Sequence, residues 1–172
     1  MSDFKTYKDC YTPVDKNEAQ KGGGQGLTFK VRRTALRQDL PIFIIKVLKQ
    51  QKDIERRTRM VREFTSLQTL KASGIPSAIE SNTEFYDNLD YKLFIVMEYI
   101  NGITVSELVQ ALLNKTLKIS FSEVAAFFNR LLDITSSCHK INIIHRDLKP
   151  DNIVLKDNDL SKSVFWNLNI LH

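Results

Sequence analysis

Residues 143 to 155 read Ile-Ile-His-Arg-Asp-Leu-Lys-Pro-Asp-Asn-Ile-Val-Leu. The apolar residues at both ends predict short strands, and the polar residues between them predict a loop. Asp147 and Asn152 lie five positions apart in this loop, so a carboxylate and an amide oxygen can act on one ligand. A lone His-Arg-Asp triplet would more often form an ordinary ion pair at a turn, so the length of the whole ordered stretch matters.

The stretch closely resembles the His-Arg-Asp-Leu-x-x-x-Asn catalytic loop of protein kinases. The resemblance implies that Asp147 accepts the proton of a substrate hydroxyl and that Lys149 contacts the transferred phosphate and that hydroxyl. It also implies that Asn152 is a ligand of the Mg²⁺ that accompanies ATP. The Lys149-Pro150 pair resembles the serine/threonine form of the loop, so the expected substrate is a protein with Ser or Thr hydroxyls.

Two charged residues upstream fit the same resemblance. The run from Pro41 to Leu48 is apolar except for Lys46, which predicts a buried strand with a lysine that needs a partner. Residues 52 to 71 lack Gly and Pro and carry apolar residues at helical spacing, and Glu63 lies on this predicted helix. By itself Glu63 would be a surface acid. The resemblance implies that Lys46 and Glu63 pair and hold the α- and β-phosphates of ATP.

A glycine-rich segment precedes the lysine strand. Residues 21 to 26 read Lys-Gly-Gly-Gly-Gln-Gly and are followed by a β-like run from Leu27 to Val31. A triple glycine alone is more often a flexible linker, but its place before Lys46 resembles the phosphate-binding loop of kinases. The resemblance implies that Gly23, Gly24 and Gly26 approach the phosphates of ATP. Lys21 stands in place of the first glycine of that loop, and Thr28 in place of its usual valine.

The apolar run from Tyr91 to Tyr99 predicts another buried strand, which Asn101 and Gly102 end. This region resembles the hinge between the two kinase lobes, with Met97 at the gatekeeper position. The resemblance implies three further adenine contacts: the backbone of Glu98, the backbone of Ile100, and an apolar floor formed by Val154. Ile44 replaces the small alanine that the family usually places above the base, which narrows the pocket. Without the catalytic loop, ordinary core packing would be preferred for all of these residues.

The chain begins β-rich and becomes α-rich near residue 102, with helices predicted over residues 105–113 and from Ser120 or Ser122 to Ile141. The expected fold class is α+β, a two-lobed protein-kinase-like fold. Its N-terminal lobe is β-rich with the single helix that the family calls αC, and its α-helical C-terminal lobe is incomplete. The expected segments are an N-terminal extension with a candidate first strand (1–20), the N-lobe (21–98), the hinge and partial C-lobe (99–160) and a divergent tail (161–172).

Residues 161 to 172 depart from the family pattern. Protein kinases continue here with a strand, Asp-Phe-Gly, an activation segment, Ala-Pro-Glu and further helices, and these twelve residues contain neither motif. We therefore expect a truncated or frameshifted end and little or no kinase activity from the chain alone. We also expect an exposed apolar side on the predicted helix up to Ile141, which a partner protein or a chaperone would cover.

Composition bounds the alternatives. The chain has 172 residues, 42% hydrophobic and 26% charged, with a net charge of +5, which is typical of a globular protein. No apolar run is long enough to cross a bilayer and the first ten residues do not resemble a secretory signal, so we expect a cytoplasmic protein without a membrane partner. Cys10 and Cys138 are expected to be reduced thiols. Residues 46–62 are basic but lack interleaved aromatic residues, which argues against nucleic acid.

Three readings remain open. The first is a serine/threonine protein kinase homologue that transfers the γ-phosphate of ATP to a protein hydroxyl, with ATP and Mg²⁺ as cofactors. The second is a catalytically inactive nucleotide-binding or protein-interaction module, and the third is a non-functional gene fragment. Intact Lys46, Glu63, Asp147 and Asn152 favour descent from an active enzyme, whereas the missing Asp-Phe-Gly favours the second and third readings.

Overall fold

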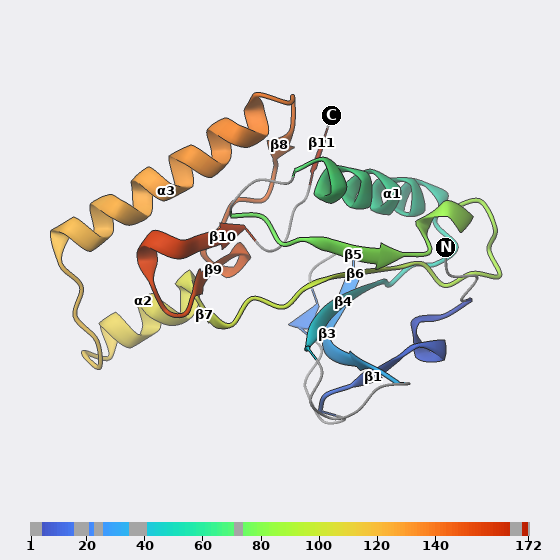
Figure 1. Ribbon diagram of the computed structural model, residues 1–172, viewed down its shortest axis with the longest axis horizontal. Coiled ribbons are helices and arrows are strands. Elements are labelled where there is room, and N and C mark those ends of the chain that lie inside the picture. The colour runs from blue at the N-terminus through green and yellow to red at the C-terminus, as the bar shows by residue number, and fades with distance from the viewer. Residues whose placement is uncertain are drawn as a thin grey trace. The chain divides into compact units, whose positions relative to one another are not determined.

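The computed structural model describes residues 5–15, 21–22, 26–34, 41–70, 74–165 and 170–171. The chain divides into two compact units. The first unit comprises Met1–Gln68 and Ser77–Tyr99, and the second comprises Thr69–Pro76 and Ile100–His172. Figure 1 shows strands and one long helix in the first unit, and two helices with short strands in the second.

The first unit is built on an antiparallel sheet. Its strands run in the order β1-β3-β4-β6-β5, and β2 pairs with β3. The strands are β1 (Tyr11–Pro13), β2 (Lys21–Gly22), β3 (Gly26–Arg33), β4 (Phe43–Leu48), β5 (Ala78–Ser81) and β6 (Phe94–Glu98). Two single-turn helices, η1 (Tyr7–Asp9) and η2 (Thr83–Phe85), complete its connections. The strands predicted over Pro41–Leu48 and Tyr91–Tyr99 are thereby confirmed as β4 and β6, which are shorter than the predicted runs.

The register divides the sheet into two chemically different faces. On β4, Lys46 lies opposite Thr28 of β3 and Ile95 of β6. Neighbouring residues of β4 point the other way, because side chains alternate along a strand. The other face carries the core cluster of Tyr11, Val31, Ile45, Val47, Phe94 and Val96. Lys46 therefore lies on the sheet face that turns away from this cluster.

Helix α1 (Ile54–Thr69) confirms the predicted helix, but its buried side differs from the expected apolar stripe. Ile54, the first apolar residue of that stripe, is half exposed. The buried residues of α1 are Arg57, Met60, Glu63, Ser66 and Leu67. Polar groups occupy much of the inner side of this helix because they bond to neighbouring parts of the first unit, as described below.

The second unit combines two helices with short antiparallel strands. Its main sheet has the order β10-β9-β7, and a separate pair joins β11 to β8. The elements are β7 (Gly102–Thr104), α2 (Val105–Leu113), α3 (Phe121–His139), β8 (Ile144–His145), η3 (Pro150–Asn152), β9 (Ile153–Lys156), η4 (Leu160–Lys162), β10 (Ser163–Phe165) and β11 (Ile170–Leu171). The two predicted helices of this region are confirmed, with Ser120 rather than Ser122 as the cap of α3 through a capping box with Glu123.

Helix α3 has one covered and one uncovered side. Ile134 and Cys138 are buried, whereas Phe121, Phe128 and Leu132 are exposed. An exposed apolar side was expected for this helix, and the described residues show it. Among the described helices, none has both the length and the apolar character needed to span a membrane.

The two units can be compared with the expected segments. Strand β1 lies in the N-terminal extension, where a candidate first strand was expected, and it pairs with β3 in the sheet of the first unit. Residues 69 to 76 belong to the second unit although they fall inside the predicted N-lobe. After residue 160, β10 pairs with β9 and Phe165 is buried. The placement of these segments depends on contacts with distant parts of the chain, which local sequence patterns do not report.

Candidate active site

The most strongly defined polar contact of the first unit joins a strand to a helix. Lys46 Nζ on β4 donates hydrogen bonds to both carboxylate oxygens of Glu63 on α1, at 2.6 and 2.7 Å. Both residues are buried, with 7% of Lys46 and 6% of Glu63 exposed. The predicted pairing of these two residues is confirmed. Two opposite charges so far from water stabilise each other, and the pair fixes an ammonium group on one face of the sheet.

Three further residues share the sheet face on which Lys46 lies. Thr28 lies directly opposite Lys46 on β3, while Ile44, two positions before Lys46, lies opposite Met97 on β6. Because side chains alternate along a strand, the register places all four side chains on one face of the sheet. Gly26 begins β3, and a Cβ atom there would lie 3.0 Å from the carbonyl oxygen of Val47 and 3.1 Å from Cγ of Lys46. A larger residue would crowd the stem of the lysine.

The other predicted glycines, Gly23 and Gly24, lie outside the described residues. The two hinge residues fall in different units, because the first unit ends at Tyr99. Glu98 ends β6 and donates its backbone N–H to the carbonyl of Ser77, at 3.0 Å. Ile100 is buried in the second unit in a small cluster with Val154 and Val164.

The catalytic-loop residues lie between β8 and β9 of the second unit. Asn152 is buried and ends η3, where its Nδ2 donates to the backbone carbonyl of Asp147 at 2.7 Å and to Oδ2 of Asp147 at 3.0 Å. Lys149 Nζ lies 2.9 Å from the same Oδ2. The structure thus brings together the three predicted catalytic residues, because both Asn152 and Lys149 contact Oδ2 of Asp147.

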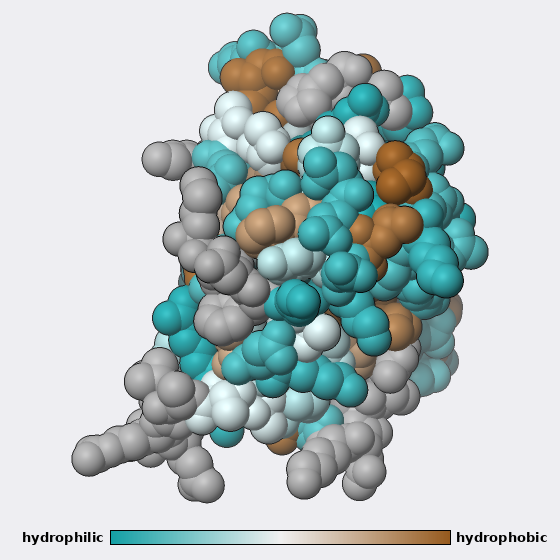
Figure 2. Space-filling model, turned by 90° about the vertical axis from the view of Figure 1, so that its right-hand side faces the viewer, coloured by the Kyte–Doolittle hydropathy of each residue, from teal (hydrophilic) through white to brown (hydrophobic). Residues whose placement is uncertain are grey.

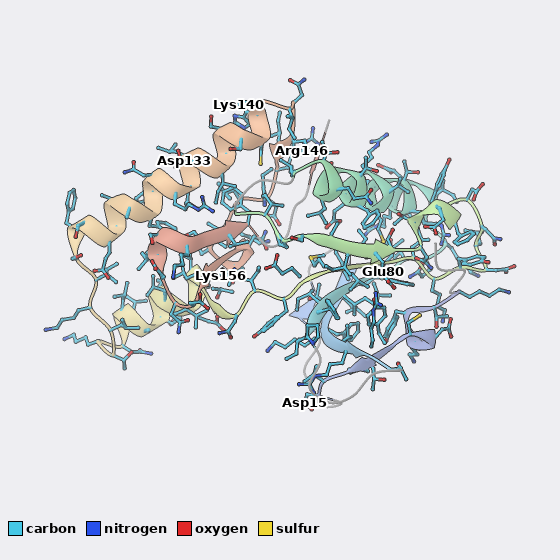
Figure 3. All side chains as sticks on the ribbon, in the orientation of Figure 1. Asp15, Glu80, Asp133, Lys140, Arg146 and Lys156 are labelled. Atoms are coloured by element: carbon cyan, nitrogen blue, oxygen red, sulfur yellow. The ribbon has the colours of Figure 1, made fainter. Side chains whose placement is uncertain are left out.

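The electrostatic setting of Asp147 favours the charged form of its carboxyl group. Hydrogen bonding from Lys149 is the main cause that lowers the pKa of the Asp147 carboxyl, and hydrogen bonding from Asn152 adds to it. The carboxylate is therefore ionised at neutral pH. Its side chain and that of Lys149 are 37% and 48% exposed, so a ligand can reach both. Figure 3 labels the neighbouring Arg146, which is exposed on the segment that follows β8.

The base of the loop is held from inside the second unit. His145 Nδ1 accepts a hydrogen bond from the backbone N–H of Asp147 at 3.3 Å. Its ring meets the ring of the buried Phe165 edge to face, with 5.3 Å between centroids. Phe165 lies on β10, so this strand contributes directly to the position of the loop.

Each unit by itself carries a group with a suitable ligand chemistry. In the first unit, the fixed ammonium of Lys46 can bond to phosphate oxygens. In the second unit, the amide oxygen of Asn152 belongs to the class of ligand that Mg²⁺ prefers. Within the described ranges, no group of three or more His, Cys, Asp and Glu side chains could hold a metal ion by itself. A Mg²⁺ ion here would need the phosphates as further ligands, as is usual for this ion.

The sequence analysis did not identify three polar residues that hold parts of the first unit together. Arg57 on α1 is entirely buried, Gln51 precedes α1, and Asn82 precedes η2. Asn82 accepts from the backbone N–H of Phe94 and donates to the carbonyl of Lys92, at 2.9 and 3.2 Å. No local signal distinguished Arg57 from the other arginines of this helix, because the carbonyl groups that bond to it belong to other segments of the chain.

Comparison with known proteins agrees with the geometry. The family model described as "Protein kinase domain" matches residues 18–164. This match covers most of the chain, including Lys46, Glu63 and the whole catalytic loop. The chain therefore belongs to the protein kinase family.

Three curated relatives are 28–30% identical to this chain over the aligned residues. Serine/threonine-protein kinase B of Synechocystis sp. is 29% identical over 139 residues, which cover 80% of this chain and 23% of the relative. CBL-interacting protein kinase 21 of Oryza sativa subsp. japonica is 30% identical over 144 residues, 83% of this chain and 26% of the relative. Calcium-dependent protein kinase 27 of Arabidopsis thaliana is 28% identical over 114 residues, 66% of this chain and 21% of the relative. The chain thus spans about a quarter of the length of these relatives.

Proposed function

We propose that this chain carries the nucleotide-binding and catalytic-loop residues of a serine/threonine protein kinase, which transfers the γ-phosphate of ATP to Ser or Thr hydroxyls of a protein substrate. The observation that carries the proposal is the buried contact between Lys46 and Glu63. Burying two charges costs desolvation energy, so most ion pairs without a ligand to bind lie at the surface. A pair buried beside a close glycine is suited to present one fixed positive charge to an anionic ligand.

In this proposal each residue has one task. Lys46 binds the α- and β-phosphates, and Glu63 holds its ammonium in place. Gly23, Gly24 and Gly26 let the backbone approach the phosphates. The backbones of Glu98 and Ile100 bond to the adenine edge, and Val154 packs against the base. All of these tasks concern ground-state binding of ATP, which orients the γ-phosphate for transfer.

The catalytic loop acts on the hydroxyl that receives the phosphate. Asp147 accepts its proton, and Lys149 contacts the transferred phosphate and the same hydroxyl. Asn152 provides an amide oxygen to Mg²⁺, an ion that neutralises charge developing on the phosphates when it is bound. The hydrogen bonds that Asn152 donates to Asp147 keep the loop in one conformation before a ligand arrives.

The test is nucleotide binding measured by the rise in unfolding temperature of the full chain. ATP with Mg²⁺ at about 1 mM should raise that temperature, because a ligand that binds only the folded state stabilises it. Lys46→Met should abolish the part of the rise that ATP causes beyond adenosine. Lys52→Met, which changes an exposed lysine in the turn before α1, should leave it unchanged.

A missing rise in the unaltered chain, or a rise that survives Lys46→Met, would remove the nucleotide assignment. Phosphorylation of a mixture of Ser- and Thr-containing peptides tests the second half of the proposal. We expect transfer by the chain alone to be small, and any transfer should disappear in Asp147→Asn. Transfer that persists in this variant would exclude Asp147 as the proton acceptor.

A finer proposal concerns the setting of the protein. We propose that it acts in the cytoplasm and that a partner protein or a chaperone covers the exposed apolar side of α3. Phe121, Phe128 and Leu132 on this helix are exposed, and both cysteines are free thiols, which fits a reducing compartment. Replacing Phe128 and Leu132 by Ser should reduce self-association in light scattering. Unchanged scattering would show that this side does not attract apolar surfaces.

A further inference from the structure

Arg57 on α1 has an environment that the nucleotide site does not explain. The residue is 0% exposed, and its guanidinium donates five hydrogen bonds to backbone carbonyl oxygens. Its Nε donates to Tyr86, Nη1 to Gln51 and Tyr91 (both 2.9 Å), and Nη2 to Phe85 (2.8 Å) and Asn88 (2.7 Å). These bonds match the donor capacity of a guanidinium group.

A buried charge bonded to neutral carbonyls is a costly feature. Burial lowers the pKa of the Arg57 guanidinium, and attraction from Asp87 only partly opposes this effect. An apolar residue of similar size would avoid that cost. The planar fork of Arg, however, can join several carbonyls in fixed directions, which neither an apolar residue nor lysine can do. The side chain is therefore better suited to fixing geometry than to filling space.

The carbonyl groups that bond to Arg57 belong to two separate connections of the first unit. Gln51 lies in the turn between β4 and α1, whereas Phe85, Tyr86, Asn88 and Tyr91 lie on the loop between β5 and β6. In Figure 1 this loop lies beside the start of α1. Arg57 thus ties the first turns of the helix to two separate connections of the sheet.

Gln51 continues this connection to the strands. Its Nε2 donates to the carbonyls of Leu48 and Leu93 at 2.8 and 3.3 Å, and its Oε1 accepts from the backbone N–H of Leu93 at 2.8 Å. Leu48 ends β4 two residues after Lys46, and Leu93 immediately precedes β6. The carbonyl cage of Arg57 is thereby tied to the strand that carries the lysine.

The spacing along the helix links the cage to the ion pair. Glu63 follows Arg57 by six residues, which is about 9 Å along the axis of an α-helix. A helix held at one point can still rotate or slide, and a shift of one residue turns a side chain by about 100°. A second fixed point removes that freedom. We propose that Arg57 is a positioning residue that sets the rotation and axial position of α1, and so holds the Glu63 carboxylate against Lys46.

The proposal deepens the proposed function and rests on it for the role of Lys46 toward phosphates. Its test, however, first needs no nucleotide. Competitive acetylation of the full chain with acetic anhydride, read by peptide mass spectrometry, reports the reactivity of Lys46 relative to the exposed Lys52. In Arg57→Met, a variant that keeps the stem but removes all donors, the relative reactivity of Lys46 should rise about tenfold, the effect of losing one charged hydrogen bond. Arg57→Lys should give a smaller rise.

Three controls separate positioning from general loss of stability. Arg56→Met changes the neighbouring arginine, whose partner is Asp53 at 3.2 Å, and should leave Lys46 unreactive. Val31→Ala weakens the core cluster on the other face of the sheet and serves as a variant matched in unfolding temperature. In Glu63→Gln, Lys46 reacts whatever the helix does, so adding Arg57→Met should produce no further rise.

The proposal is overturned if Lys46 stays unreactive in folded Arg57→Met or Arg57→Lys, if Val31→Ala produces the same rise, or if the effects of Arg57→Met and Glu63→Gln multiply. Binding of ATP then distinguishes this proposal from the proposed function. Loss of the Lys46-dependent ATP effect in Arg57→Met, with adenosine binding retained, supports both. If the unaltered chain shows no ATP effect while the acetylation pattern holds, the nucleotide assignment fails and the positioning role of Arg57 stands.

Discussion

The two units hold the charged residues of the proposed sites in opposite ways. In the first unit, Lys46 and Glu63 are almost completely buried and bond to each other through both carboxylate oxygens. In the second, Asp147 and Lys149 form a partly exposed pair on a loop. A buried pair fixes a charge, because separating the two residues would leave each charge buried and uncompensated. In an exposed pair, either residue can leave its partner and contact a ligand instead. The buried pair suits an anion that stays bound in one place, and the exposed pair suits transient contact with a reacting group.

The two units also differ in how apolar residues are arranged on their surfaces. Figure 2 looks onto the end of the first unit where α1 begins, and hydrophilic residues predominate there between small separate hydrophobic patches. In the second unit, by contrast, α3 exposes several large apolar residues along one helix. The first unit also exposes apolar residues, such as Ile54, Ile79 and Leu89, but the second unit gathers them on one helix, where they form a surface that water does not solvate well.

The largest expected effect breaks the buried pair. Glu63→Gln leaves Lys46 buried without a carboxylate, which should lower the free energy of unfolding by about 3–5 kcal/mol. Urea denaturation measures this loss. The double variant Lys46→Met with Glu63→Leu should recover much of it, because no charge is then buried. In the second unit, Lys149→Met should have little effect, since exposed pairs contribute little. Equal losses from the two pairs would erase the contrast between the units.

The next effect compares two residues of α3. Ile134 is 1% exposed and Leu132 is 67% exposed. Ile134→Ala should cost about 3 kcal/mol, because it leaves a cavity in packed surroundings. Leu132→Ala should change the stability by less than about 0.5 kcal/mol. Denaturation of both variants gives the comparison, and a large loss in Leu132→Ala would show that its side of the helix is covered in solution.

A smaller effect is expected at the beginning of the second unit. Gly102 has φ of 152°, and a Cβ atom there would lie 1.9 Å from the carbonyl oxygen of Leu155. Gly102→Ala should therefore force β7 away from β9 and cost about 2–3 kcal/mol. Hydrogen exchange should show lost protection in β7 and β9, with protection of β3 and β4 unchanged. Uniform loss over both units would mean that the two units unfold together.

The smallest effect is on titration. The pKa of Asp147 should lie below the usual range of an aspartate, mainly because of its hydrogen bond from Lys149. A lowered pKa stabilises the fold above the unfolded-state pKa, and this stability is lost as the pH falls through the folded-state pKa. Because the pair is exposed, that stability is small. NMR titration of the carboxyl carbon should show the pKa rising in Lys149→Met, and an unchanged value would exclude Lys149 as the cause.

Several features could be predicted from local sequence alone. Strands β4 and β6, helices α1, α2 and α3, and the loop between β8 and β9 all follow from patterns within short windows. The partnership of Lys46 with Glu63 was predictable because a buried strand lysine requires a carboxylate, and the motif spacing indicated which one. The grouping of Asp147, Lys149 and Asn152 was predictable because all three belong to one short loop.

Other features depend on contacts between segments far apart in the chain. Strand β10 has only three residues, and its place in the fold depends on pairing with β9. Arg57 looks like any surface arginine of a basic helix, and Ile54 looks like a core residue, yet their burial is the reverse. The sequence by itself determined the local elements and the motif residues. Only the tertiary structure decided which polar groups lie inside, because a buried arginine is stable only where distant backbone carbonyls converge on it.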